Sequence, residues 1–351
     1  MNMVKVFIGK RESKFSYIPV LFPNLGSLKD ERHLFADRGF RAFTEKVVEL
    51  VDDLSAADFI LLPYDYFSIL ERDRAVFDEY LALSKKSGKK ILIFDFSDYS
   101  ERSIDVPNSW IFRVAGYRHH WRENEIMMPY FVEDLCVGRP IEVRIKGEKP
   151  VIGFCGWAGF KTWRAAVKAK VKMVYLNMLR YAQGDKEARA HEQGIFLRIA
   201  ALKRLAASSK VLTNFIVRRA YGSHKATIEL SPEEARRQYI ENMENSDLAL
   251  AVRGDSNFSQ RFYEALSLGR IPLLIDTDCV LPLENELRYD EFMIRVDHRD
   301  IGRIGDIVAE RYRALSPEDF KKMQQRAREV FENYLKADSF FAYVLPKLIV
   351  K

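Results

Sequence analysis

The sequence has few cysteines and no long apolar run. Its three cysteines lie far apart, and none belongs to a C-x-x-C pair. This spacing indicates neither a disulfide framework nor a zinc ribbon, so we expect buried, reduced thiols. No apolar stretch approaches the roughly 18 residues of a membrane span, and the opening segment MNMVKVFIGKRES does not resemble a signal peptide. We therefore expect a cytoplasmic protein that could meet a membrane only at its surface.

A strong excess of charge of one sign is also lacking. The chain has 56 basic and 50 acidic residues, which gives a net charge of +6. This surplus allows a mild attraction to nucleic acid, an anionic membrane or a phosphorylated small molecule. The sequence contains no P-loop, H-E-x-x-H, G-x-S-x-G, EF-hand or nucleic-acid motif. A basic two-domain module that binds nucleic acid in a strongly salt-dependent way remains the alternative to an enzyme.

What the sequence does contain is an alternation of short apolar strands and helical patterns, typical of βαβ units with parallel sheets. In the first half, strands are predicted at 4–9, 58–63, 90–96 and 109–116, and helices at 30–50 and 73–87. After a polar segment at 143–149 the alternation resumes, with strands predicted at 151–156, 210–217, 247–252, 271–275 and 291–296.

With 351 residues, the chain is long enough for two cores. We predict an α/β protein with two facing Rossmann-like domains built on parallel sheets. The predicted domains cover 1–145 and 150–330, and a helix over 331–351 could return to the first domain. Ligands of such sheets bind beyond the carboxyl ends of the strands, which indicates where to look for a site.

The stretch VRGDSNFSQRFYEALSLGRIPLLID, residues 252–276, contains such a strand end. A polar turn follows the predicted strand, and either Ser256 or Asn257 could cap the next helix. Within that helix Arg261 and Glu264 share one face. The adhesion tripeptide Arg-Gly-Asp also occurs in the turn, but it would require an exposed loop on a secreted protein.

The helix start offers unpaired N–H groups to an anion, and Arg253 and Arg261 could add forked donors for a diphosphate. Glu264 could accept hydrogen bonds from both hydroxyls of a ribose. Alternatively, Arg261 and Glu264 form an exposed pair that stabilises the helix by only about 0.3–0.5 kcal/mol. The spacing alone leaves both interpretations open.

The same stretch resembles the signature of exostosin-family glycosyltransferases: a strand, Ser-x-Arg, Glu-Ala, a glycine and an Ile-Pro strand. Those positions are occupied by Ser259, Arg261, Glu264, Ala265, Gly269, Ile271 and Pro272. Similar family segments are DFILLPYDY (58–66), PVIGFCGWAG (150–159) and LPLENELRYDEFMIRV (281–296). The resemblance spans most of the chain, but only 246–296 is specific. Arg270, where the family often has Cys, and Tyr289, where Trp is usual, depart from it.

The resemblance implies a GT-B architecture and a metal-independent transfer, usually with inversion, that needs no cofactor. The donor would be a nucleoside-diphosphate sugar, expected to be a UDP-sugar, on the second domain. The acceptor would be a glycan or a lipid-linked glycan on the first. Glu264 would then bind the ribose, and the phosphates would be held by Arg253, Gly254, Ser256, Asn257, Ser259 and Arg261. Gly156 and Trp157 lie in a loop that could approach the donor or the acceptor closely.

An inverting transfer needs a general base, for which Asp65 and His120 are candidates because each follows a predicted strand. Capping the next helix is the simpler role for Asp65. Adjacent side chains of a strand point to opposite faces, so we do not expect His119 and His120 to chelate one metal. The tripeptide 276–278 resembles the D-x-D metal motif of the GT-A architecture, but its position indicates a turn.

The predicted helix at 161–181 combines basic and apolar residues, namely Lys161, Trp163, Arg164, Val167, Lys168, Lys170, Val171, Lys172 and Val174. A basic amphipathic helix can lie on an anionic membrane surface, which would suit a lipid-linked acceptor. A solvated helix on the domain surface is the simpler interpretation.

Overall fold

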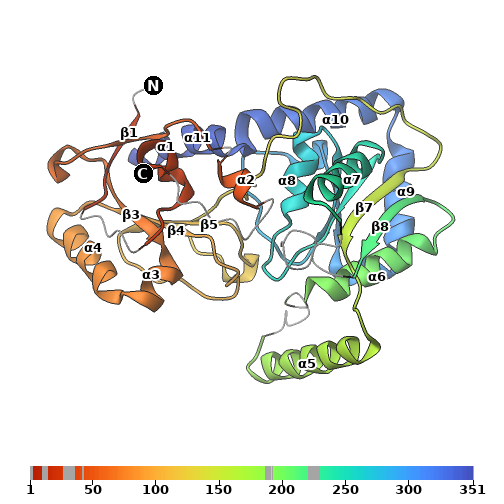
Figure 1. The fold of residues 1–351 in the computed structure, drawn as a ribbon, viewed down its shortest axis with the longest axis horizontal. Helices are drawn as coiled ribbons and strands as arrows, with labels where there is room; N and C mark the ends of the chain where they lie inside the picture. Colours follow the sequence, from red (N-terminus) through yellow and green to blue (C-terminus); the bar gives the residue numbers. More distant parts are fainter. Residues whose placement is uncertain are drawn as a thin grey trace.

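The computed structural model describes residues 3–9, 15–26, 36–41, 43–185, 191, 193–219 and 230–350. It contains two α/β domains that lie side by side (Figure 1). All pairings between named strands are parallel. The three cysteines are buried and unpaired, as predicted.

The first domain has a six-stranded sheet of order β2-β1-β3-β4-β5-β6. Its strands are β1 (Val4–Phe7), β2 (Val48–Leu50), β3 (Phe59–Asp65), β4 (Ile91–Asp95), β5 (Ser109–Arg113) and β6 (Glu125–Met127). Its helices are α1 (Phe22–Leu25), α2 (Ala36–Arg41), α3 (Tyr66–Arg72) and α4 (Arg74–Ser87). The inner strands are almost continuously apolar because helices and loops bury both faces.

The helix predicted at 30–50 is wrong at its end. Residues 48–50 form β2, which pairs with β1 from Val4↔Val48 to Val6↔Leu50. Of the rest, α2 begins at Ala36, and residues 30–35 and 42 lie outside the described residues. Val48 is fully buried, so pairing with β1 stabilises a strand that is too short to show a pattern of its own.

The second domain has a five-stranded sheet of order β11-β10-β9-β7-β8. Its strands are β7 (Val151–Trp157), β8 (Leu212–Arg218), β9 (Leu248–Ala251), β10 (Ile271–Asp276) and β11 (Ile294–Asp297). Its helices are α5 (Trp163–Ala182), α6 (Gly194–Ala206), α7 (Pro232–Glu244), α8 (Gln260–Ser267), α9 (Ile304–Ala314) and α10 (Pro317–Val330). The chain adds β8 on one side of β7 and β9 on the other, so a crevice is expected beyond the carboxyl ends of β7 and β9.

The chain crosses between the domains twice. In the segment after β6, Arg144 Nε lies 2.6 Å from Asp247 Oδ1, which fixes that segment on the second domain. At the far end, a π-helical turn (Phe331–Leu335) leads to α11 (Ala337–Ile349). Helix α11 lies along the first domain (Figure 1), where Phe340 and Phe341 are fully buried in its core. These two crossings hold the domains face to face.

Helix α5 stands away from the body of the molecule (Figure 1). Met173 is its only buried residue among those the structure describes. Among the described helices, none combines the length and the apolar character needed to span a bilayer. Helix α5 is therefore a surface feature, and apart from Met173 its large apolar residues are not buried by the rest of the described chain.

Candidate active site

A cavity of about 710 Å³ lies between the two domains. This volume is within the range of small-molecule sites. The first domain lines it with Phe40, Phe96, Asp98 and Tyr130. The second domain lines it with Cys155, Gly156, Trp157, Ile195, Arg198, Arg218, Ala235, Arg236, Tyr239, Val252, Gly254, Asp255, Ser256, Phe258, Ser259, Gln260, Arg261 and Glu264.

The cavity lies where the fold predicts a crevice. Residues 155–157 end β7, and 252–259 connect β9 to α8. Helix α8 begins at Gln260. Its N-cap residue is Ser259, whose side chain makes no capping hydrogen bond. The prediction that Ser256 or Asn257 would cap this helix is therefore wrong. Gly269 ends the helix region with φ +63°, as predicted.

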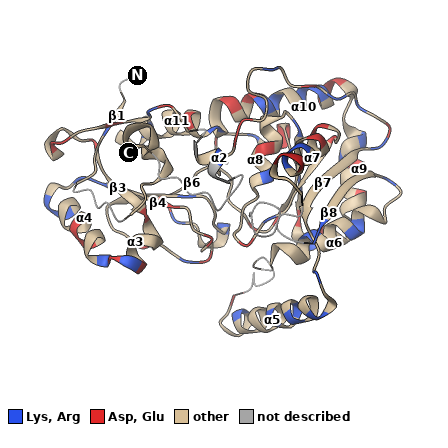
Figure 2. Ribbon diagram, viewed as in Figure 1, with Lys and Arg blue, Asp and Glu red and all other residues tan. Residues whose placement is uncertain are grey.

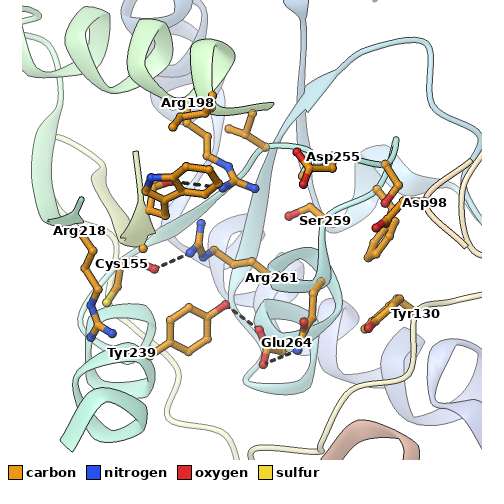
Figure 3. A pocket seen from close by; sticks show the side chains of 18 of the residues that line it. Asp98, Tyr130, Cys155, Arg198, Arg218, Tyr239, Asp255, Ser259, Arg261 and Glu264 are labelled. Atoms are coloured by element: carbon orange, nitrogen blue, oxygen red, sulfur yellow. Dashed lines mark hydrogen bonds between the residues drawn. The ribbon is translucent and has the colours of Figure 1, made fainter. Parts of the chain in front are cut away.

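Glu264 lies inside the cavity wall and is 2% exposed. Its Oε1 accepts a hydrogen bond from Arg236 Nη1 at 3.0 Å, and its Oε2 accepts one from the Tyr239 hydroxyl at 2.6 Å (Figure 3). Burial opposes the charge on Arg236, but Glu264 and then Glu133 outweigh it and raise the pKa of Arg236. Burial, and next the Glu264 charge, raise the pKa of Tyr239, which remains a donor. Each carboxylate oxygen can accept more than one bond, so this buried carboxylate can still bind hydroxyls.

Arg261 is fixed at the edge of the sheet. Its guanidinium carbon lies 4.3 Å from the centre of the Phe154 ring and 5.3 Å from that of Tyr239. Its Nη2 donates to the main-chain oxygen of Cys155 (Figure 3). A Cβ on Gly156 would lie 2.9 Å from Nη2, so the glycine leaves room for the guanidinium. These contacts hold the positively charged guanidinium of Arg261 in place beside the cavity before any ligand binds.

Three further arginines in the cavity come from elements that the sequence analysis did not connect. Arg198 of α6 donates to the main-chain oxygens of Trp157 at 3.2 Å and Arg253 at 2.9 Å. Arg218 ends β8, and Arg236 lies in α7. Four arginines and three carboxylates line the cavity, so it has one net positive charge, which favours an anion. These residues carry no local motif, and only the fold brings them together.

Two residues predicted to bind phosphate do not line this cavity. Arg253 is 5% exposed, and it donates to the Tyr117 hydroxyl and to the main-chain oxygen of Asp255. Asn257 donates its side-chain amide to the main-chain oxygen of Gly116 at 3.1 Å. Both side chains therefore hold the domains together. Gly254, Ser256, Ser259, Arg261 and Glu264 line the cavity, as do Gly156 and Trp157.

Neither predicted base lines the cavity. Asp65 caps α3 by accepting from the Ser68 N–H at 3.0 Å, and it also accepts from the Phe96 N–H at 2.9 Å. His120 follows β5, as predicted, and lies in a 3₁₀ helix, η3 (Arg118–His120). The expectation that the rings of His119 and His120 diverge is wrong, because in η3 their centres are 4.2 Å apart. Burial, and then His119, lower the pKa of His120.

The tripeptide 276–278 forms a turn, as predicted. Asp276 Oδ1 accepts from the Cys279 N–H at 3.0 Å, and Asp278 has φ +60°. The Arg118 N–H donates to the main-chain oxygen of Asp278 at 2.8 Å, so the turn contacts the first domain. The tripeptide does not line the cavity. The carboxylate that the first domain does place in the cavity is Asp98, which the sequence analysis missed.

Two facing Rossmann-like domains, with a cavity at the carboxyl ends of their strands, define the GT-B class. Residues 195–310 match the Exostosin GT47 domain. The match covers α6 to α9 and includes Arg198, Arg236, Arg261 and Glu264. This part of the chain is thus similar to exostosin-like glycosyltransferases, as the resemblance implied.

Similar curated proteins agree with this assignment. Exostosin-1 of Drosophila melanogaster is 32% identical over 102 residues, which is 29% of this chain and 13% of that protein. A probable glucuronosyltransferase of Oryza sativa subsp. japonica is 36% identical over 70 residues, which is 20% of this chain and 16% of that protein. The chain therefore aligns with only a small part of these relatives.

Solved structures with similar chains include HepE of Anabaena in complex with UDP, at 9% identity, a TM-score of 0.41 and full coverage of both chains. Another is the lipopolysaccharide outer core galactosyltransferase WaaB, at 14% identity and a TM-score of 0.40, covering 98% of this chain and 100% of that one. Because these scores are low, the GT-B assignment rests on the two sheets and the position of the cavity.

Proposed function

We propose that this protein transfers a sugar from a nucleoside-diphosphate sugar, expected to be a UDP-sugar, to a glycan acceptor. The observation that carries the proposal is the buried Glu264 carboxylate in the cavity between the domains, inside the matched segment. Its bonds to Arg236, Tyr239 and Gln260 hold it in one orientation. A fixed carboxylate suits the two hydroxyls of a ribose.

The diphosphate would lie beside Glu264, against Arg261, Arg198 and the first N–H groups of α8. Fixed positive charges at that position stabilise the diphosphate as it leaves, which lowers the barrier without a metal. We therefore propose a metal-independent, inverting transfer. Asp98 replaces Asp65 and His120 as the proposed general base, because it enters the same cavity from the acceptor domain.

A thermal-shift panel with UDP, GDP, ADP and CMP in EDTA tests the donor site. A ligand at 100 times its Kd stabilises the folded state by about 2.7 kcal/mol, which corresponds to a shift of several degrees. We expect UDP to stabilise the wild type and to lose this effect in Glu264→Gln. Glu125→Gln is the matched control, since Glu125 is a buried carboxylate that pairs with Arg113 at 3.0 Å outside the cavity.

Three outcomes would contradict this proposal. The donor site is wrong if no nucleotide stabilises the wild type, or if both glutamine variants lose the effect equally. Stabilisation that appears only with Mn²⁺ or Mg²⁺ would instead refute metal independence. Release of UDP from a UDP-sugar in the presence of an acceptor then tests the transfer itself.

We further propose that the acceptor is lipid-linked and that α5 lies on an anionic membrane surface. Five apolar side chains recur at helical spacing along one face of α5 and are 46–72% exposed: Trp163, Val167, Val171, Val174 and Met178. The helix carries five basic residues and no acidic one, and its ribbon in Figure 2 accordingly shows blue segments among tan ones. An exposed apolar stripe flanked by positive charge is typical of interfacial helices, and each basic residue near an anionic surface adds about 1 kcal/mol.

Sedimentation with vesicles tests this placement. We expect the full chain to bind vesicles that contain phosphatidylglycerol and to bind pure phosphatidylcholine far more weakly. Lys168→Glu/Lys172→Glu should abolish binding, whereas Lys85→Glu/Lys86→Glu on exposed turns of α4 should leave it unchanged. Equal loss in both variants would indicate a general charge effect. If the α5 variant instead dissociates a dimer in light scattering, the stripe is an interface between two copies.

A further inference from the structure

Three histidines gather at the contact between the two domains, outside the cavity. His119 and His120 belong to η3 of the first domain, and His191 precedes α6 of the second. One ring nitrogen of each lies within 4.8 Å of the other two. The fold thus brings together imidazoles that are about 70 residues apart in sequence.

His191 is the buried member of this cluster, with 8% of its surface exposed. Its Nε2 lies 3.0 Å from Asp185 Oδ2, yet neither ring nitrogen makes a well-aligned hydrogen bond within the described residues. The Tyr117 ring packs against it with centres 4.1 Å apart. Buried polar atoms in native proteins are nearly always bonded, so Nδ1, the nitrogen for which no salt bridge is found, requires a partner that the described side chains do not supply.

We propose that His119, His120 and His191 bind one divalent transition-metal ion of the Zn²⁺ type, which links the two domains. Three neutral imidazoles are an established ligand set for Zn²⁺ and leave a fourth position open. Tetrahedral Zn–N bonds of 2.0–2.1 Å would place the nitrogens about 3.3 Å apart. The ring nitrogens now lie within 4.8 Å of one another. Rotation of the exposed His119 and His120 side chains on η3 would bring them to the shorter distance.

Two carboxylates lie where ring-orienting groups of a zinc site would be. Asp278 contacts His119 Nδ1, and Asp185 lies beside His191. Carboxylates that hold the second nitrogen of a ligating histidine fix the ring and make it a better ligand. They also partly offset the positive charges of Arg180 and Arg253, which lie near His191.

The same surroundings select the kind of ion. Nearby arginines oppose a dication, so the ion must form strong bonds to nitrogen. Mg²⁺ and Ca²⁺ prefer oxygen ligands and should bind poorly. Because none of the three histidines lines the cavity, this ion would not touch the donor diphosphate, and the proposal is compatible with metal-independent transfer.

Zinc binding to the tag-free, chelator-treated full chain tests the site directly. We expect one Zn²⁺ per chain and a rise in the unfolding temperature with ZnCl₂ that MgCl₂ does not produce. His120→Ala should weaken zinc binding by at least about 10–100-fold, because losing a carboxylate that only orients a ligand already has an effect of this size. His120 is exposed, so its loss should not impair folding. His298→Ala, outside the cluster, should bind zinc like the wild type.

Two results would overturn the proposal: a wild type that binds no zinc, or a His120→Ala variant that binds it as tightly as the wild type. Asp278→Asn offers a second test, with an expected loss of about 10–100-fold in zinc affinity through the orientation of His119. The measurement uses no sugar nucleotide. A failure here would therefore leave the proposed transferase function untouched, and the reverse is also true.

Discussion

The second domain lines the cavity with four arginines and two carboxylates, whereas the first contributes three aromatic rings and a single carboxylate. Apart from the exposed Asp255, the charged groups that the second domain places in the cavity are already bonded to the protein. Glu264 is held by Arg236 and Tyr239, and Arg261 by main-chain oxygens at the strand ends. In the first domain, Asp98 is exposed, and Tyr130 stacks on Phe258 with ring centres 4.6 Å apart.

This difference separates two tasks. The second domain provides a charge pattern that is complete before a ligand arrives, as expected where a leaving group must be stabilised. The first domain provides apolar surface and one exposed carboxylate, Asp98. We call the cavity-lining residues of the second domain the donor wall and those of the first domain the acceptor wall. Substitutions in the acceptor wall should therefore lower the rate of transfer, whereas substitutions in the donor wall should weaken nucleotide binding and destabilise the fold.

The largest effect is expected from Asp98→Asn. If Asp98 takes the proton of the acceptor hydroxyl, its loss should lower kcat by about 10²–10⁴-fold. Stabilisation by UDP should be unchanged, since the donor wall is intact. Glu101→Gln, an exposed carboxylate three residues further on and outside the cavity, is the control and should retain its rate. If the Asp98→Asn variant keeps its kcat, Asp98 is not the general base, and the proposed difference in task between the two domains is wrong.

The sequence predicted the donor wall better than the acceptor wall, and the reason is physical. Arg261 and Glu264 lie in one helix next to a strand, so their relation is set by local geometry and visible in spacing. Asp98 and Arg198 join the cavity only through the packing of separate elements, and no local pattern marks them. Apart from the three-residue strands β2 and β6, the strands of both sheets were predictable because apolar, β-branched runs must be buried.

The errors have equally local causes. Residues 48–50 are too few to show an alternation, and β2 exists because β1 pairs with it. His119 and His120 were placed as if in a strand, and nothing in GYRHHW marks a 3₁₀ turn. For α5, the amphipathic pattern was predictable, but whether another element covers its apolar stripe depends on the whole fold. A pattern shows which face is apolar, and only packing decides whether that face is buried.

A smaller effect, on stability, should come from Arg236→Ala. This change leaves Glu264 buried without its ion-pair partner, and breaking a buried pair costs about 3–5 kcal/mol. The Tyr239 hydroxyl remains bonded to Glu264, so we expect the lower end of that range in urea unfolding. UDP binding should weaken as well, since the carboxylate loses its fixed orientation.

The neighbouring Arg237 is a matched control, because it pairs with Glu234 on the same helix but its side chain is 62% exposed. Arg237→Ala should leave the free energy of unfolding nearly unchanged, because exposed ion pairs contribute little. If both variants unfold at the same urea concentration, the Arg236–Glu264 pair does not order the wall. The contrast between a pre-bonded donor side and an open acceptor side would then rest on Arg261 alone, whose bonds to the ends of β7 and β9 do not depend on Arg236.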